Sequence, residues 1–142
     1  MTDNFCYPYR VRSNGEGDFI ATFRDIPEAM TEAPTLENLR SMAVDALITA
    51  IDFYIEGGKK LPAPTSPEDG EAVAVLPPSV VSKVLLLNTM AEQHCRQADL
   101  AKKMGISRQE VTRIVDLRHA TKIDTISKAL NVLGKRLVIS AV

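Results

Sequence analysis

The stretch 97–114 constrains the fold of this chain more than any other, because a single glycine separates two short helical patterns. Leu100 and Ala101 share one face of the first helix, and Ala101 is small enough for a second helix to cross closely. Gly105 permits the left-handed backbone that a tight turn between helices requires. Ser107 is a favourable N-cap for the helix that follows. The spacing therefore predicts a helical hairpin with a sharp turn at Gly105.

The second helix of this hairpin leaves one face free. Ile106 enters the core from the turn, and Val111 and Ile114 seat the helix on the rest of the domain. Arginine and glutamine on the opposite face can each form paired hydrogen bonds to purine edges in the major groove. Base contacts are expected from the donor-bearing residues Ser107, Arg108, Gln109, Thr112 and Arg113.

This hairpin resembles the helix-turn-helix of Cro-type phage repressors, whose pattern runs Gln-x-x-Leu-Ala-x-x-x-Gly-(Ile/Val)-Ser-x-x-x-Val-x-x-Ile. Residues 94–136 also contain 10 Lys/Arg against 4 Asp/Glu, which is the excess expected of a DNA-binding surface. Phosphate contacts are expected from residues before and after the second helix: Gln97, Arg118, His119, Thr121 and Lys122. The alternative is an ordinary helical hairpin without a ligand. A structural role is the alternative for His119, since no nucleophile or orienting carboxylate accompanies it as a catalytic base would require.

The rest of the C-terminal half is also mostly helical. Apolar spacing predicts helices over residues 79–93, 97–104, 107–116 and 124–133. Residues 136–142, which end Leu-Val-Ile-Ser-Ala-Val, are predicted to form a strand. Because a lone strand leaves backbone groups unpaired, we expect this tail to pair with a second subunit, giving a homodimer or a higher homo-oligomer. Packing of the tail on its own chain is the alternative.

The N-terminal half has a different pattern. Alternating apolar residues and turn-forming residues predict strands over residues 5–12, 18–24, 30–33 and 71–76. Thr35 is expected to cap a helix that ends at Gly57 and Gly58. The predicted apolar face of that helix consists of Leu36, Leu39, Met42, Ala43, Ala46, Leu47, Ala50, Ile51 and Tyr54. A small α+β domain results, and the Pro-Pro pair after it predicts domains over residues 1–76 and 77–142.

The net charge of −1 conceals an unequal distribution. Residues 1–71 contain 6 Lys/Arg and 13 Asp/Glu, whereas residues 72–142 contain 11 Lys/Arg and 5 Asp/Glu. The basic C-terminal half therefore suits a polyanion, and the acidic N-terminal half suits a basic partner. No segment approaches the roughly 20 apolar residues of a membrane-spanning helix. The N-terminus has no signal-peptide pattern, and the two cysteines have no ligand spacing, so a cytoplasmic protein is expected.

Several segments outside the hairpin carry a resemblance that covers nearly the full chain. They are residues 25–31, 46–56, 61–64, 79–88, 109–113 and 119–124. On these segments the chain resembles the HicB antitoxin family of bacterial HicAB type II toxin–antitoxin systems. One departure is the segment 32–35, where relatives often carry glycine before the helix-capping threonine and this chain has Pro34.

The resemblance implies an α+β protein in which a small, partial RNase H-like N-terminal domain is followed by an all-helical Cro-type helix-turn-helix domain with a C-terminal strand. It implies that the N-terminal domain binds and neutralises a small basic HicA toxin, an mRNA-cleaving ribonuclease. It further implies that the C-terminal domain represses the operon encoding both proteins by binding operator DNA. The acidic run Asp25, Glu28 and Glu32 supplies the first candidates for toxin contact, and a merely solvated run is the alternative.

No catalytic residue, metal site or cofactor is expected. Nucleases of RNase H-like fold hold clustered carboxylates and two metal ions, and the candidate carboxylates in this chain are Asp18, Asp25, Asp45 and Asp52. No histidine or glutamate completes a ligand set with them. Two other functions stay open beside the antitoxin: a metal-dependent nuclease, and a transcriptional regulator without a toxin partner whose N-terminal domain binds a ligand or only dimerises.

Overall fold

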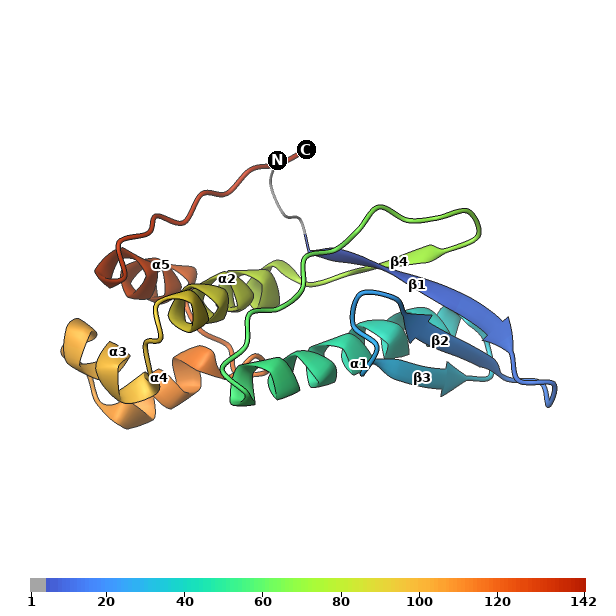
Figure 1. Cartoon of the computed structure of the whole chain (residues 1–142), viewed down its shortest axis with the longest axis horizontal. Coiled ribbons are helices and arrows are strands. Elements are labelled where there is room, and N and C mark those ends of the chain that lie inside the picture. The colour runs from blue at the N-terminus through green and yellow to red at the C-terminus, as the bar shows by residue number, and fades with distance from the viewer. Residues whose placement is uncertain (1–4) are drawn as a thin grey trace. The chain divides into compact units, whose positions relative to one another are not determined.

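Four strands and five helices follow one another in the described part of the chain, residues 5–142 of a computed structural model (Figure 1). Their bounds are β1 Cys6–Ser13, β2 Phe19–Phe23, β3 Met30–Ala33, α1 Leu36–Glu56, β4 Ala72–Val75, α2 Pro78–Glu92, α3 Gln97–Met104, α4 Arg108–Val115 and α5 Ile123–Val132. Two compact units are present: residues 5–54 with 61–76, and residues 55–60 with 77–142. The predicted α+β class is confirmed, with every predicted helix and every strand before residue 77 within two residues of its expected ends.

The first unit contains one antiparallel sheet with strand order β3-β2-β1-β4. The central pair is in register with Val11 opposite Ala21, and β4 adds to the other side of β1 with Ala74 opposite Tyr7. A tight turn joins β1 to β2, where the Asn14 side chain accepts hydrogen bonds from the backbone N–H groups of Glu16 (2.8 Å) and Asp18 (3.1 Å). This asparagine turn fixes the register of the hairpin.

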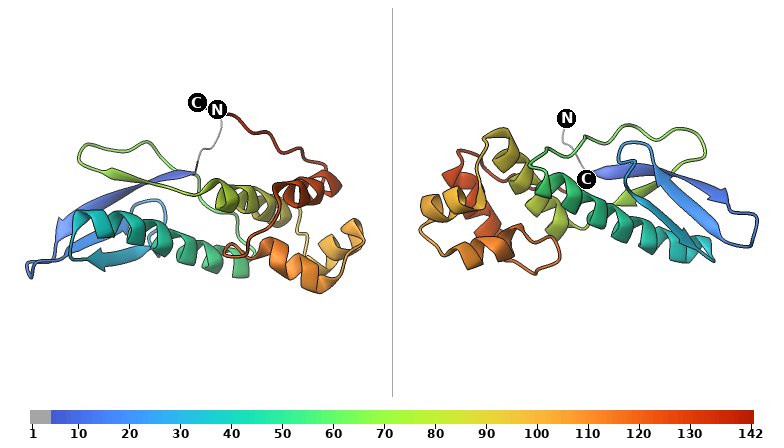
Figure 2. Two further views of the ribbon diagram at one scale, coloured as in Figure 1. Left: turned by 180° about the vertical axis from the view of Figure 1, so that it is seen from behind. Right: turned by 60° about the horizontal axis from the view of Figure 1, so that its bottom comes forward.

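Helix α1 runs along one face of this sheet (Figures 1 and 2). Its first turn is capped by Thr35, whose hydroxyl oxygen accepts a hydrogen bond from the Asn38 N–H at 3.1 Å. The sheet and the helix contribute buried apolar side chains to a shared core: Tyr7, Tyr9, Ala21, Phe23, Leu39, Ala43, Leu47, Ile48, Ala50 and Ile51. This core explains why the helix forms here, since an amphipathic face is stabilised mainly by what it packs against.

The predicted apolar face of α1 was partly wrong. Leu36 and Met42 are 58% and 42% exposed, whereas Ile48, which the spacing does not include, is buried. The apolar residues of α1 cover a wider arc of the helix than one sheet can bury. Which of them reach the core depends on the rotation of the helix against the sheet, and periodicity alone does not determine that rotation.

The second unit is a bundle of four short helices, α2 to α5. Their buried apolar residues form one cluster, with Leu86 from α2, Leu100 from α3, Val111 from α4 and Ile126 from α5 at its centre. Such a cluster is needed because none of these helices is long enough to be stable alone.

The predicted C-terminal strand is absent from the described residues. Residues 134–142 contain no strand, and Leu137 is the one residue among them that packs against the helical cluster. Val138 and Ile139 are exposed. A strand requires a neighbouring strand for its backbone hydrogen bonds, and the helical unit of one chain contains none.

Candidate nucleic-acid interface

The helices α3 and α4 form the predicted hairpin. The Asp99 carboxylate accepts a hydrogen bond from the Arg96 N–H at 3.0 Å and closes the start of α3. At its other end Gly105 has a φ of +68°, which a residue with a side chain adopts only with strain. The Ile106 N–H then returns to the Ala101 carbonyl at 3.1 Å. The chain therefore leaves α3 in a left-handed turn and enters α4 at once, as the sequence predicted.

Helix α4 is held by its cap and by one buried face. The Ser107 hydroxyl accepts a hydrogen bond from the Glu110 N–H at 3.1 Å, which confirms the predicted N-cap. Val111 and Ile114 are buried in the helical cluster as expected, and Val115 joins them. The other side of α4 therefore faces solvent.

The residues predicted to contact bases differ in whether their side chains already have hydrogen-bond partners within the protein. The side chains of Arg108, Gln109 and Arg113 are exposed and form no hydrogen bond or ion pair with any of residues 5–142. Thr112 is exposed too, but its hydroxyl donates to the Arg108 carbonyl at 3.0 Å. The Ser107 hydroxyl is occupied by the cap. Arg108 and Gln109 near the start of α4 and Arg113 near its end are thus free to contact a ligand.

The residues predicted to contact phosphates lie on both sides of α4. Gln97 opens α3, and its amide oxygen lies 3.4 Å from the Thr112 hydroxyl, so the start of α3 lies beside α4. His119 Nδ1 lies 3.3 Å from the Thr121 hydroxyl. Lys122 is exposed at the N-cap of α5, and Arg118 is exposed in the preceding loop.

An open hollow of about 770 Å³ joins several of these residues on the surface of the helical unit. Its polar lining includes Arg113 of α4, His119, Thr121 and Lys122 of the following loop, and Lys128 of α5. Three of these residues are Lys or Arg. The fold therefore gathers on one surface basic groups that lie up to 15 residues apart in the chain.

Sequence reasoning missed one residue of this region. Lys83 of α2 is 2% exposed, and its Nζ donates to the backbone carbonyls of Arg113 (3.1 Å), Asp116 (2.6 Å) and His119 (2.6 Å). Burial lowers the pKa of Lys83, and the negative charge of Asp116 opposes that shift. The only signal in the sequence is a lysine inside the apolar run that follows Pro78.

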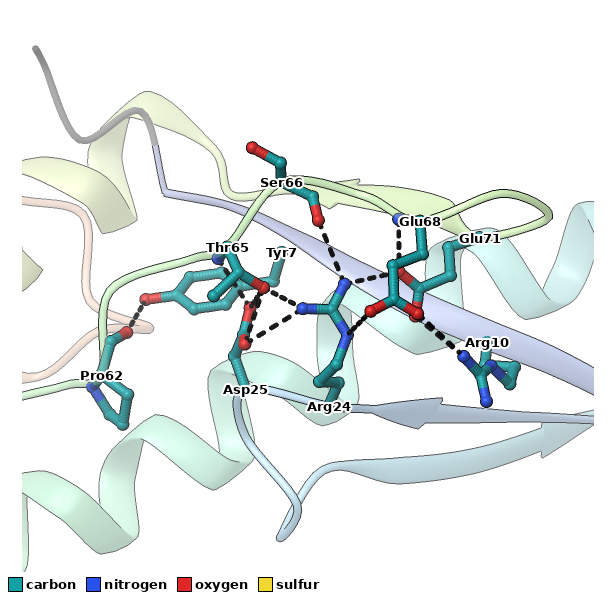
Figure 3. Close-up of polar contacts among 9 residues, drawn as sticks. All are labelled: Tyr7, Arg10, Arg24, Asp25, Pro62, Thr65, Ser66, Glu68 and Glu71. Carbon is teal, nitrogen blue, oxygen red and sulfur yellow. Dashed lines mark hydrogen bonds and ion pairs between the residues drawn. The ribbon is translucent and has the colours of Figure 1, made fainter.

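The three acidic residues predicted to contact a toxin lie in the first unit and have internal partners. The Asp25 carboxylate accepts hydrogen bonds from the Thr65 N–H (2.9 Å) and hydroxyl (3.0 Å), and its side chain is 8% exposed (Figure 3). Glu28 accepts from the Tyr54 hydroxyl at 2.6 Å, and burial and this carboxylate raise the pKa of Tyr54 to about 12. Glu32 accepts from the Asn14 amide at 2.5 Å. Glu28 and Glu32 are exposed, whereas Asp25 serves mainly to hold the loop after α1.

A second group of charges, also missed from the sequence, surrounds Arg24 (Figure 3). Its guanidinium donates to the Glu71 carboxylate at 2.6 Å, to the Ser66 carbonyl at 3.2 Å and to the Thr65 hydroxyl. The pKa of Glu71 is lowered, first by the hydrogen bond from Arg24. Arg24 therefore ties the loop before β4 to the end of β2.

Comparison with known proteins agrees with this architecture. Residues 6–85 match the model of the "HicB_like antitoxin of bacterial toxin-antitoxin system" family, and residues 88–139 match a helix-turn-helix model. Antitoxin HicB 2 of Photorhabdus laumondii is 46% identical over 142 residues, which is all of both chains. Antitoxin HicB 1 of the same organism is 45% identical over 96% of this chain and 87% of its own. Antitoxin HicB of Escherichia coli K12 is 41% identical over 92% of this chain and 95% of its own.

This chain belongs to the HicB-like antitoxin family.

The antitoxin-family match covers the strands of the first unit and extends into α2, whereas the helix-turn-helix match lies within the second unit. The DNA-binding helix-turn-helix occupies the second unit, with α3 and α4 inside the matched residues 88–139. The relatives are named antitoxins and not enzymes. Among residues 5–142, no three His, Cys, Asp or Glu side chains lie close enough to hold a metal ion together. None of the helices described has the length and apolar character needed to cross a membrane.

Proposed function

We propose that this HicB-like protein is an antitoxin that binds and neutralises a HicA-type mRNA-cleaving toxin and represses its own operon by binding operator DNA. The observation that carries the proposal is the joining of an antitoxin-family domain to a helix-turn-helix in a single chain. The rival idea of a regulator without a toxin partner does not account for the antitoxin-family match over residues 6–85.

The DNA half of the proposal is supported by the free face of α4. Arg108 and Gln109 stand at the N-terminal end of that helix, where recognition helices contact base edges. Both side chains carry donors suited to purine edges, and neither is used inside residues 5–142. The basic groups around the hollow beside α4 would contact phosphates next to the major groove that the helix enters.

The toxin half is supported by charge. Residues 1–71 hold 13 Asp/Glu against 6 Lys/Arg, so a basic ribonuclease would meet a complementary surface there. Of the three acidic candidates, Glu28 and Glu32 are the exposed ones. We place the toxin contact in residues 1–76 and the DNA contact in residues 77–142.

The proposed DNA-bound form is a homodimer. The tail after Leu137 exposes Val138 and Ile139 and contains no strand, so it is available to pair with a second copy. Two recognition helices related by a two-fold axis would reach successive major grooves about 34 Å apart on an inverted-repeat operator.

The test combines both halves in one preparation. The chain is co-expressed with the product of the neighbouring gene, and the purified material is assayed for ribonuclease activity and for binding to the DNA upstream of its own operon. A stable complex without ribonuclease activity that also binds the upstream DNA is the expected result. DNA binding without any toxin partner would instead favour the simple regulator.

A further inference from the structure

The ammonium of Lys83 has three donors, and the structure supplies three acceptors for it. Its Nζ lies 2.6 Å from the carbonyl oxygens of Asp116 and His119 and 3.1 Å from that of Arg113. Lys83 itself is almost completely buried on α2, next to the buried Ser82 and Val84. A buried charge is tolerated only when it is paired or fully hydrogen-bonded. The three carbonyls therefore compensate for the burial of the Lys83 charge.

The three carbonyls belong to the end of α4 and to the loop behind it. Arg113 is in the last turn of α4, Asp116 is its C-cap residue and His119 lies three residues further on. The last carbonyls of a helix lack intrahelical partners and form the negative end of the helix dipole. An ammonium placed there satisfies these carbonyls and is stabilised by the dipole.

Apart from the ammonium, the segment 113–119 is held by short-range backbone turns and by the buried side chain of Leu117. The Asp116 N–H reaches the Arg113 carbonyl at 3.3 Å, and the His119 N–H reaches the Asp116 carbonyl at 3.1 Å. These are two consecutive single turns, each closed by one backbone hydrogen bond, and the Asp116 carboxylate also accepts a hydrogen bond from the Arg118 N–H at 3.0 Å. Lys83 donates to the carbonyls that close both turns, those of Arg113 and Asp116, and also to the carbonyl of His119. It therefore links the two turns to each other.

We propose that Lys83 is a positioning residue for DNA binding, which fixes the end of α4 and the loop 116–119 in one arrangement. Two of the three residues that it holds by their carbonyls, Arg113 and His119, are themselves candidate DNA contacts with exposed side chains. The inference rests on the proposed DNA-binding function of α4. Lys83 itself touches no DNA, and it acts only by holding one base-contacting and one phosphate-contacting residue at a set spacing.

The chemistry of the residue predicts how substitutions rank. Methionine keeps an unbranched apolar stem, one atom shorter than that of lysine, but leaves all three carbonyls without this donor. Arginine keeps the charge, yet its planar fork cannot direct three donors at three converging acceptors as a tetrahedral ammonium does. Operator affinity should therefore decrease in the order wild type, Lys83→Arg, Lys83→Met.

The experiment uses the full chain, with Lys83→Met, Lys83→Arg and the control Lys59→Met, which removes an exposed lysine from the same unit. Circular dichroism establishes that each variant folds. Affinity is measured for a duplex from the upstream region of the operon and for a random duplex of equal length. Amide hydrogen exchange is followed at Asp116 and His119, and at Ile106 as an internal reference.

For Lys83→Met, we expect affinity for the upstream duplex to fall at least about tenfold, with a smaller loss on the random duplex. Exchange at Asp116 and His119 should accelerate at least about tenfold, while exchange at Ile106 and the affinities of Lys59→Met stay unchanged. A folded Lys83→Met with wild-type exchange and wild-type affinity would overturn the proposal. If Lys83→Met does not fold, Lys83→Arg decides: an operator-to-random affinity ratio within about twofold of wild type would overturn it.

The two readouts separate the inference from the proposed function. A wild-type chain that binds neither duplex would contradict the DNA-binding proposal, and with it the role of Lys83 in positioning. The exchange data would then still decide whether Lys83 orders the segment 113–119. Normal wild-type binding together with unchanged binding by the folded Lys83→Met would contradict only the inference about Lys83.

Discussion

The guanidinium of Arg24 lies 2.6 Å from the carboxylate of Glu71, and the Glu71 side chain is only 1% exposed. This pair links the end of β2 to the residue just before β4. The hydrogen bond from Arg24 lowers the pKa of Glu71, so the folded state favours the ionised carboxylate more than the unfolded state does. The first unit is therefore expected to lose stability in acid in a way that can be traced to one residue.

Replacing Glu71 by glutamine tests this expectation. A carboxyl group with a lowered folded-state pKa contributes stability above its unfolded pKa of about 4.3, and that contribution is lost as the pH falls through the folded value. Glu71→Gln should therefore be less stable than wild type at about pH 7, and the difference should shrink as the pH falls below about 4. Urea denaturation across this range measures it. Glu68→Gln, at a site 60% exposed, is the control and should show a smaller change. A pH-independent difference for Glu71→Gln would contradict the assignment.

Base reading by α4 is tested with Arg108→Ala and Gln109→Ala. Each should weaken binding to the upstream operator by about 1–3 kcal/mol and relax the preference at one base pair, because a specific donor pair is lost. Binding to operator variants at fixed salt measures both effects. Arg40→Ala removes an exposed arginine from the first unit and should change neither. An equal loss on specific and random DNA would remove the residue from base reading.

Phosphate contact by Lys122 predicts a different pattern. Lys122→Ala should weaken binding to all sequences about equally and reduce the slope of log affinity against log salt by about one. Titrations at several salt concentrations give the slope. Lys59→Ala, which also removes an exposed lysine from the second unit, should leave the slope unchanged. An unchanged salt slope for Lys122→Ala would rule out a contact between Lys122 and a phosphate.

The tail is tested by deleting residues 138–142, which keeps Leu137 in its place against the helical cluster. If the tails of two copies pair as proposed, loss of the exposed apolar tail should reduce the mass of the assembly in solution. Operator affinity should fall with it, since two half-sites are no longer held together. A folded truncation with full assembly and full affinity would exclude the tail as the dimer contact.

The two-unit architecture predicts that the proposed toxin binding and the proposed DNA binding can be separated. Residues 1–76 alone should retain the toxin in a pull-down and fail to bind the upstream DNA. Circular dichroism must first establish that the fragment folds. Within it, Glu28→Gln and Glu32→Gln should weaken toxin binding more than they weaken folding, whereas Asp25→Asn should act mainly on stability through the Thr65 contacts. A folded fragment that does not hold the toxin would place the contact elsewhere.

Local chemistry explains which features the sequence predicted well. The cap at Ser107, the turn at Gly105 and the cap at Thr35 each depend on neighbours within three or four residues. The seating of α4 on Val111 and Ile114 follows from helical periodicity in the same way. From these features the helix-turn-helix and the exposed face of α4 were predictable from the sequence alone.

The sequence by itself thus determined the elements, their order and the presence of the hairpin, because caps, turns and periodicity act over a few residues. Only the tertiary structure decided which distant groups meet. Lys83 reaches carbonyls 30 to 36 residues away, and Arg24 reaches a carboxylate 47 residues away. Tertiary packing also decided that Leu36 stays exposed and that the tail pairs with no strand within residues 5–142. Such long-range pairings depend on how whole elements rotate and pack, and no local pattern in the chain encodes that geometry.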